Sequence, residues 1–146
     1  DDILERTFVK YPQKQVILTL SPVRHTRNGL VGNSVSKSIL RTAIHNLTQL
    51  SNVYYFPSYE ILLDELRDYR FYNEDMVHPS SLTIRYIWDC FVQSYMPEST
   101  KQLLQDIQNV EKMKSHRFLR ATEHEIAEFK EKIKKKELEI QKRLNS

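Results

Sequence analysis

The sequence predicts an α/β protein in which short parallel strands alternate with helices. Two nearly uniformly apolar runs, residues 15–20 and 53–56, are each followed by a helical pattern. Strands that are apolar throughout are typical of parallel sheets, because helices cover both faces of such sheets. The 146 residues leave room for one domain of this kind. We expect an α/β part over residues 1–96 and a helical extension over residues 97–146.

In the first half of the chain, a short helical start is followed by strand, helix, strand and helix. The expected elements cover residues 2–9, 15–20, 33–50, 53–56 and 59–67. Asn33 or Ser34 can cap the long helix with its side chain, and Pro57 ends the second strand. This order of elements is the one found in α/β units with parallel strand pairing.

Three further helices are expected in the second half. Ser80 or Ser81 caps the first of them, which Pro97 stops, and the second covers residues 99–116. The last helix opens with a capping box at residues 122–125 and carries a narrow apolar seam among lysines and glutamates. We expect this seam to pack on the chain itself or on a second copy of it.

Composition excludes several classes of protein. No apolar stretch approaches the roughly 20 residues that a membrane span needs, and a net charge of +3 does not indicate nucleic-acid binding. A single cysteine, Cys90, excludes an intrachain disulfide. The two glycines do not form a phosphate-binding loop, so we expect no nucleotide and no other cofactor. A metal site is disfavoured because the chain has no closely paired histidines on one helix face; its candidate ligands would be His25, His45, Asp75 and His78.

The segment Asp75-Met76-Val77-His78-Pro79 is the strongest candidate for chemistry. A carboxylate this close to an imidazole can hold it in one tautomer and stabilise its charged form, as a catalytic triad requires. The simpler alternative is a loop in which Asp75 caps a turn and His78 bonds a carbonyl group. The pair lies between an α/β segment and a helix, which favours the catalytic interpretation, because ligands of open sheets bind at such loops.

A second candidate segment, residues 21–25, leaves the C-terminal end of the first strand, where ligands of doubly wound sheets bind. Arg24 can clamp an anionic group and His25 can donate a hydrogen bond, so both are candidates for substrate binding at the rim of a pocket. The alternative is a polar loop without a ligand. Tyrosines are numerous enough nearby to wall a pocket: Tyr55, Tyr59, Tyr69 and Tyr72.

Four separated segments together carry a resemblance to a known family: VILTLSPVRH (16–25), YYFPSYE (54–60), DELRDYRF (64–71) and EDMVHPS (74–80). With these segments in this order, the chain closely resembles the C-terminal part of the GSCFA domain family, a branch of the SGNH/GDSL hydrolases. The resemblance implies part of a flavodoxin-like three-layer sandwich, in which helices cover a parallel sheet. It also implies that Asp75 and His78 are the acid and base of the active site.

The segment that carries the family's nucleophile does not occur in this chain. We therefore expect a C-terminal fragment of an esterase or acyl hydrolase, in which Asp75 orients His78 and His78 takes a proton from a serine supplied upstream. The intact protein would act on a small acyl ester, whereas this chain alone would be inactive and would form a homodimer. The alternative is a non-catalytic helical interaction module whose last two helices are the working part. The compartment is left open, with the cytoplasm favoured.

Overall fold

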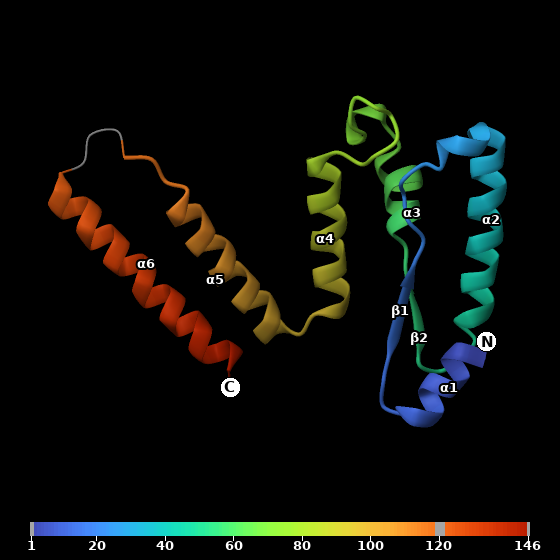
Figure 1. Cartoon of the computed structure of the whole chain (residues 1–146), viewed down its shortest axis with the longest axis horizontal. Coiled ribbons are helices and arrows are strands. Elements are labelled where there is room, and N and C mark those ends of the chain that lie inside the picture. Colours follow the sequence, from blue (N-terminus) through green and yellow to red (C-terminus); the bar gives the residue numbers. More distant parts are fainter. Residues whose placement is uncertain (1, 119–121, 146) are drawn as a thin grey trace. The chain divides into compact units, whose positions relative to one another are not determined.

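The computed structural model of the chain describes residues 2–118 and 122–145, and it is a mixed α/β structure that is mostly helical (Figure 1). The chain divides into two compact units, residues 1–91 and 92–146. The predicted division after residue 96 stays a prediction. In the described part of the chain, no helix combines the length and the apolar character required to cross a bilayer.

The first unit contains both strands and most of the helices. Its long elements are α1 (Asp2–Lys10), β1 (Val16–Thr19), α2 (Gly29–Leu47), β2 (Val53–Phe56) and α4 (Ser81–Tyr95), which continues into the second unit. Short helical segments stand at Thr26–Asn28, Ser58–Glu60 (α3), Ile61–Leu66 and Tyr69–Phe71. The second unit holds α5 (Glu98–Lys114) and α6 (Glu123–Leu144).

The two strands pair in parallel, which confirms the strand prediction. Their register runs from Val16 opposite Val53 to Thr19 opposite Phe56. Figure 1 shows the sheet between α2 and α4. Phe56 of β2 contacts Phe91 of α4, with ring centroids 5.1 Å apart. The α/β class is therefore confirmed. The flavodoxin-like sandwich is not, because the described residues contain only two strands.

Apolar burial in the first unit lies on β2 and on the segments that follow the two strands. Its most buried hydrophobic side chains are Leu20, Val53, Phe56, Ile61, Leu62 and Tyr72. Thr83 is fully buried, and its hydroxyl donates to the Phe71 carbonyl at 2.6 Å. Ser80 caps α4 as expected, because its Oγ accepts the Thr83 N–H at 3.3 Å. The start of α4 is thereby attached to the chain that precedes it.

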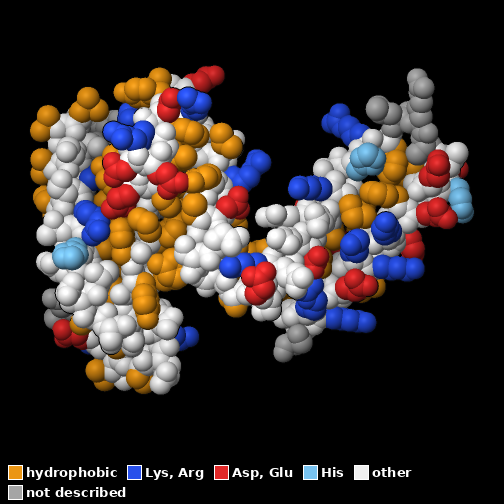
Figure 2. Space-filling view, turned by 180° about the vertical axis from the view of Figure 1, so that it is seen from behind, with side chains coloured by type: hydrophobic (Ala, Val, Ile, Leu, Met, Phe, Trp, Pro, Cys, Tyr) orange, Lys and Arg blue, Asp and Glu red, His pale blue; other side chains and the backbone are white. Residues whose placement is uncertain are grey.

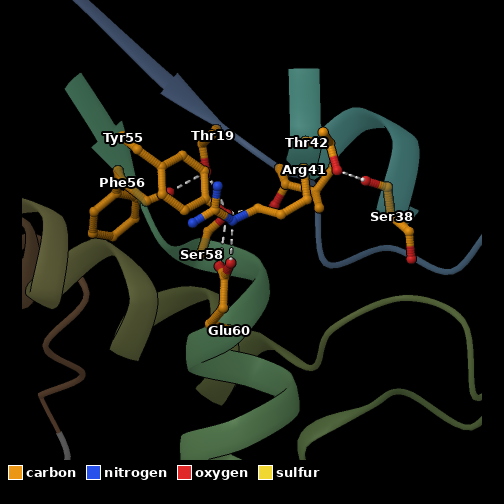
Figure 3. Close-up of polar contacts among 9 residues, drawn as sticks. Thr19, Ser38, Arg41, Thr42, Tyr55, Phe56, Ser58 and Glu60 are labelled. Atoms are coloured by element: carbon orange, nitrogen blue, oxygen red, sulfur yellow. Dashed lines mark hydrogen bonds and ion pairs between the residues drawn. The ribbon is translucent and has the colours of Figure 1, made fainter. Parts of the chain in front are cut away.

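A polar cluster joins α2 to the second strand and to α3 (Figure 3). Arg41 Nε lies 2.9 Å from Glu60 Oε1, and the Tyr55 hydroxyl donates to Glu60 Oε2 at 2.6 Å. The Arg41 guanidinium also lies over the Tyr55 ring, 4.3 Å from its centroid. Partial burial, together with the Glu60 carboxylate, raises the pKa of Tyr55, so its hydroxyl stays protonated and remains a donor.

Several helices differ from their predicted bounds, and the largest differences are in α2 and in the segment after β2. The long helix begins at Gly29, earlier than expected, because the Asn33 side chain accepts the His25 N–H at 2.7 Å and does not cap the helix. The same helix ends at Leu47, earlier than the predicted Leu50, where the chain tightens into turns that lead to β2. The predicted helix at residues 59–67 is one α-helical turn followed by a π-helix, Ile61–Leu66. Arg67, just after this π-helix, has a φ of 55°.

In the second unit, α5 and α6 pack side by side and antiparallel. Arg143 of α6 pairs with Asp106 in the middle of α5, whereas Glu137 pairs with Lys114 at its end. The predicted capping box at Thr122 is confirmed: its Oγ1 accepts the Glu125 N–H at 3.3 Å. The apolar seam of the last helix was expected to pack on the chain itself or on a second copy. In the structure, α6 packs on α5 of the same chain.

The expected self-association follows from the exposed apolar surface of the first unit, where many hydrophobic side chains are visible (Figure 2). An apolar groove of about 410 Å³ lies between the sheet and α4; it is lined by Ile17, Thr19, Phe56, Ser58, Ile84, Ile87, Trp88 and Phe91. Within the described residues β1 pairs only with β2, which leaves its other edge open. Two strands are also too few for a stable sheet unless other elements cover them.

We therefore expect light scattering at micromolar concentration to detect a dimer. Ile17→Lys, which places a charge on the open strand, should shift the chain toward the monomer. Ile3→Lys makes the same change at an exposed position on α1 and should leave the dimer intact. A natural chain that stays folded and monomeric contradicts the prediction.

Candidate active site

The loop between Tyr72 and Pro79 is closed at its base. These two residues form an antiparallel bridge, and the Asn73 N–H donates to the His78 carbonyl at 2.8 Å. Just outside the bridge, the Ser80 N–H donates to the Phe71 carbonyl at 2.9 Å. Because the two ends of the loop are bonded to each other, the side chains between them have a fixed frame.

Asp75 is the acceptor around which this loop is arranged. Its Oδ1 accepts the N–H groups of Val77 at 2.9 Å and His78 at 3.0 Å, and its Oδ2 lies 2.6 Å from His78 Nδ1. The His78 backbone N–H, followed by the imidazole and the Val77 N–H, holds the pKa of Asp75 at about 2, below its ordinary value of 3.8. Asp75 is therefore ionised at neutral pH and can only accept hydrogen bonds.

This contact determines the tautomer of His78. Since the carboxylate has no proton to give, Nδ1 carries the proton of a neutral imidazole and Nε2 keeps its lone pair. The His78 side chain is 59% exposed and borders a cleft of about 530 Å³. The cleft is lined by Pro22, Val23, Ser58, Asn73, His78, Pro79, Ile84 and Ile87. The Nε2 lone pair can take a proton from a group within hydrogen-bond reach.

The structure brings the second predicted segment to the same loop. The Arg24 N–H donates to the Val77 carbonyl and its Nη1 to the Met76 carbonyl, each at 3.2 Å. His25 is exposed, and its N–H donates to Asn33. Pro22 and Val23 line the cleft, whereas Arg24 and His25 do not border it. The substrate-binding roles of Arg24 and His25 stay predictions.

The expectation that four tyrosines wall the pocket is wrong, since none of them lines the His78 cleft. Their rings lie against cations elsewhere in the unit. Arg24 lies over Tyr72 and Tyr69, at 4.3 and 5.6 Å from the ring centroids. Tyr55 and Tyr59 lie beneath Arg41 and Lys37 of α2, respectively.

Sequence reasoning missed two residues near the site, Ser58 and Lys37. Ser58 borders the cleft and is buried; its Oγ donates to the Leu20 carbonyl at 2.8 Å and lies 2.6 Å from Thr19 Oγ1. Lys37 is 8% exposed, donates to the Ser21 carbonyl at 2.6 Å and has a pKa lowered by burial. Ser58 could have been found from its position just after the second strand. Apolar periodicity gave no signal for Lys37, because its apolar neighbours Ile39 and Leu40 are exposed whereas Lys37 is buried.

The described residues contain no group of three or more His, Cys, Asp or Glu side chains arranged to hold a metal ion. His45, one of the four ligands considered, lies in the last turn of α2. Of the other three, His78 and Asp75 are in contact, with Nδ1 and Oδ2 2.6 Å apart.

Comparison with protein families adds an independent observation to this geometry. The model of the GSCFA family matches residues 1–91, which is more than half of the chain. The chain belongs to the GSCFA family. The matched region contains β1, β2 and both candidate segments, so it coincides with the unit that holds the cleft. Comparisons with curated proteins and with solved structures gave no match.

The low pKa of Asp75 predicts a specific dependence of stability on pH. Because the pKa of about 2 in the folded chain lies below the unfolded value of about 3.9, ionised Asp75 stabilises the fold above about pH 4. This contribution is lost as the pH falls through about 2. Urea unfolding at a series of pH values should show a weaker acid dependence for Asp75→Asn than for the natural chain.

Glu74→Gln provides the matched control, because it removes a neighbouring carboxylate that takes no part in the hydrogen bonds of Asp75. This variant should retain the acid dependence of the natural chain. Equal acid dependence in Asp75→Asn and the natural chain contradicts the assignment.

Proposed function

We propose that this GSCFA-family chain carries the acid and base of a serine esterase or acyl hydrolase of the SGNH/GDSL type. The observation that carries the proposal is the 2.6 Å contact between Asp75 Oδ2 and His78 Nδ1, with the imidazole at the border of a cleft. This arrangement leaves Nε2 as a proton acceptor, which is the role of the histidine in a Ser–His–Asp mechanism. The substrate is a small acyl ester, and the reaction requires no cofactor.

In the proposed reaction, a serine hydroxyl attacks the ester carbonyl carbon and His78 Nε2 takes the hydroxyl proton. The resulting imidazolium is stabilised by Asp75, which stays ionised throughout because its pKa is low. His78 then returns the proton to the leaving alcohol as the C–O bond of the ester breaks. Water attacks the acyl-enzyme in the second half of the reaction, with His78 again as the base.

The nucleophile is proposed to come from a segment outside residues 1–146. Among the described residues, Ser58 is the one serine that borders the cleft. Its hydroxyl is buried and is shared between the Leu20 carbonyl and Thr19, so it has no hydrogen bond to His78 (Figure 3 shows it beside Thr19). A hydroxyl donated to a carbonyl group is not activated for attack, because no base receives its proton.

The same proposal extends the sheet. A flavodoxin-like sandwich would place further parallel strands beside the open edge of β1 and further cover over the apolar groove. The parallel pairing of β1 with β2, and the helices α2 and α4 on the two sides of the sheet, support this extension. The exposed side chains of Ile17 and Trp88 also support it, since both are apolar and lie in that groove.

The alternative is a non-catalytic interaction module whose working part is α5 and α6. That function does not require His78 to act as a base, and its side chain would then be bonded to backbone groups away from any cleft. The contact of its Nδ1 with a carboxylate and its position at the cleft favour the hydrolase.

We expect the present chain by itself to lack esterase activity, because the activated nucleophile is missing. Purified chain offered p-nitrophenyl acetate should release p-nitrophenol no faster than the His78→Ala variant. His124→Ala removes an exposed histidine on α6 and controls for simple imidazole catalysis. Turnover that His78→Ala abolishes and His124→Ala preserves would overturn the assignment of the nucleophile to another segment.

Asp75 and His78 should act as one unit in the enzyme that includes the nucleophile. The double variant Asp75→Ala/His78→Ala should be little slower than His78→Ala alone, because members of a triad lose activity non-additively. The kcat/KM values of the natural enzyme, both single variants and the double variant form the required cycle. Losses that multiply would mean that the two residues do separate tasks.

A further inference from the structure

Arg24 contacts the back of the loop that holds Asp75 and His78. Its backbone N–H donates to the Val77 carbonyl and its guanidinium Nη1 donates to the Met76 carbonyl, both at 3.2 Å. Arg24 and Met76 are 52 positions apart in the chain, so their contact is a tertiary connection between two separate loops. It joins the segment that follows β1 to the loop that precedes α4.

The peptide groups that Arg24 contacts are the same ones that Asp75 contacts. A trans peptide unit is planar, with its carbonyl and its N–H pointing in opposite directions. The Met76 carbonyl belongs to the same unit as the Val77 N–H, and the Val77 carbonyl to the same unit as the His78 N–H. Arg24 donates to both carbonyls, and Asp75 Oδ1 accepts from both N–H groups. The two residues therefore hold the same pair of peptide planes from opposite sides.

The guanidinium of Arg24 is itself held in place. It lies 4.3 Å from the centroid of the Tyr72 ring and 5.6 Å from that of Tyr69. Tyr72 is buried and forms the bridge to Pro79 at the base of the loop. A planar guanidinium stacked on an aromatic face keeps its donors in a fixed direction, which a flexible ammonium does not.

The loop needs such support because of its backbone conformation. Met76 has a φ of 56°, a left-handed value that costs energy for a residue with a side chain. Such a conformation persists only where surrounding contacts determine it. The carbonyl of Met76 is the acceptor of Arg24 Nη1, so the contact acts at the strained residue.

We propose that Arg24 is a positioning residue: it orients two peptide groups of the loop so that Asp75 holds His78 in its working tautomer. This role differs from the clamp on an anionic substrate that the sequence suggested. The effect on the loop stands on geometry alone, and its consequence for catalysis rests on the proposed function.

The first test uses NMR on the present chain with Arg24→Ala, Arg24→Lys and Arg27→Ala. Each variant keeps the backbone N–H of residue 24, so Arg24→Ala removes only the guanidinium contacts. We expect Arg24→Ala to weaken the signal of the hydrogen-bonded His78 Nδ1 proton. The pKa of Asp75, followed by its carboxyl carbon, should rise from about 2 toward its ordinary value of 3.8.

Arg24→Lys should restore these signals in part, because it keeps a donor but loses the planar stack. Arg27→Ala removes an exposed arginine from the same connection and should leave both signals unchanged. Circular dichroism verifies that each variant is folded, and Arg24→Lys keeps the test decisive if Arg24→Ala does not fold. If the Nδ1 proton and the pKa of Asp75 are the same in all folded variants, the positioning role is overturned.

The second test uses the enzyme that includes the nucleophile, with an uncharged acyl ester as substrate. A positioning role lowers kcat in Arg24→Ala, by up to about 100-fold, and leaves KM unchanged. A rise in KM with kcat unchanged would instead indicate a substrate clamp and would overturn the proposal. If the NMR changes occur but the natural enzyme has no esterase activity, the proposed function fails while the role of Arg24 in the loop stands.

Discussion

The hydrogen bonds to the Asp75 carboxylate are the interaction on which the candidate site depends. One oxygen accepts two backbone N–H groups of its own loop, and the other meets the His78 imidazole. The first pair of bonds fixes where the carboxylate lies, and the third bond uses that position to orient the ring. These hydrogen bonds fix both side chains on a loop, although Asp75 and His78 are about half exposed.

The frame of this loop depends in turn on the buried end of the first unit. The Phe71 carbonyl accepts both the Ser80 N–H and the Thr83 hydroxyl, and Thr83 is fully buried at the start of α4. The loop is therefore connected directly to the helix that follows it. Leu20 and Phe56, buried at the C-terminal ends of β1 and β2, lie at the same edge of the sheet. The loop with Asp75 and His78 is thus bonded to a buried residue of a regular helix, which gives the candidate site a rigid support.

Aromatic rings in this protein hold cations where a tyrosine-rich sequence suggested a pocket wall. Tyr72 lies against Arg24, and Tyr55 lies against Arg41, each at 4.3 Å from the ring centroid. In both cases the arginine bonds a group on another element: a carbonyl of the Asp75 loop or the Glu60 carboxylate. These stacked arginines join segments that are distant in the chain, and they leave the cleft lined mainly by aliphatic side chains and proline.

The sequence by itself determined the α/β class, the two parallel strands now seen at Val16–Thr19 and Val53–Phe56, the family, and the capping box at Thr122. These features depend on local periodicity, on turn chemistry, or on residue order along the chain, all of which are present in the sequence. Proximity of Asp75 to His78 was also predictable, because the two are only three residues apart. The start of the long helix was not predictable, because Asn33 bonds the backbone of His25 and that contact exists only after the chain has turned.

Only the tertiary structure decided what Arg24, Ser58 and the tyrosines do. Each of these polar groups could satisfy its hydrogen bonds or its charge in several ways, and residue type alone does not choose among them. Arg24 contacts the carbonyls of Met76 and Val77 because the fold brings the segment that follows β1 beside the loop that precedes α4. Partners this far apart in sequence are selected by the packing of the whole unit, which no local pattern records.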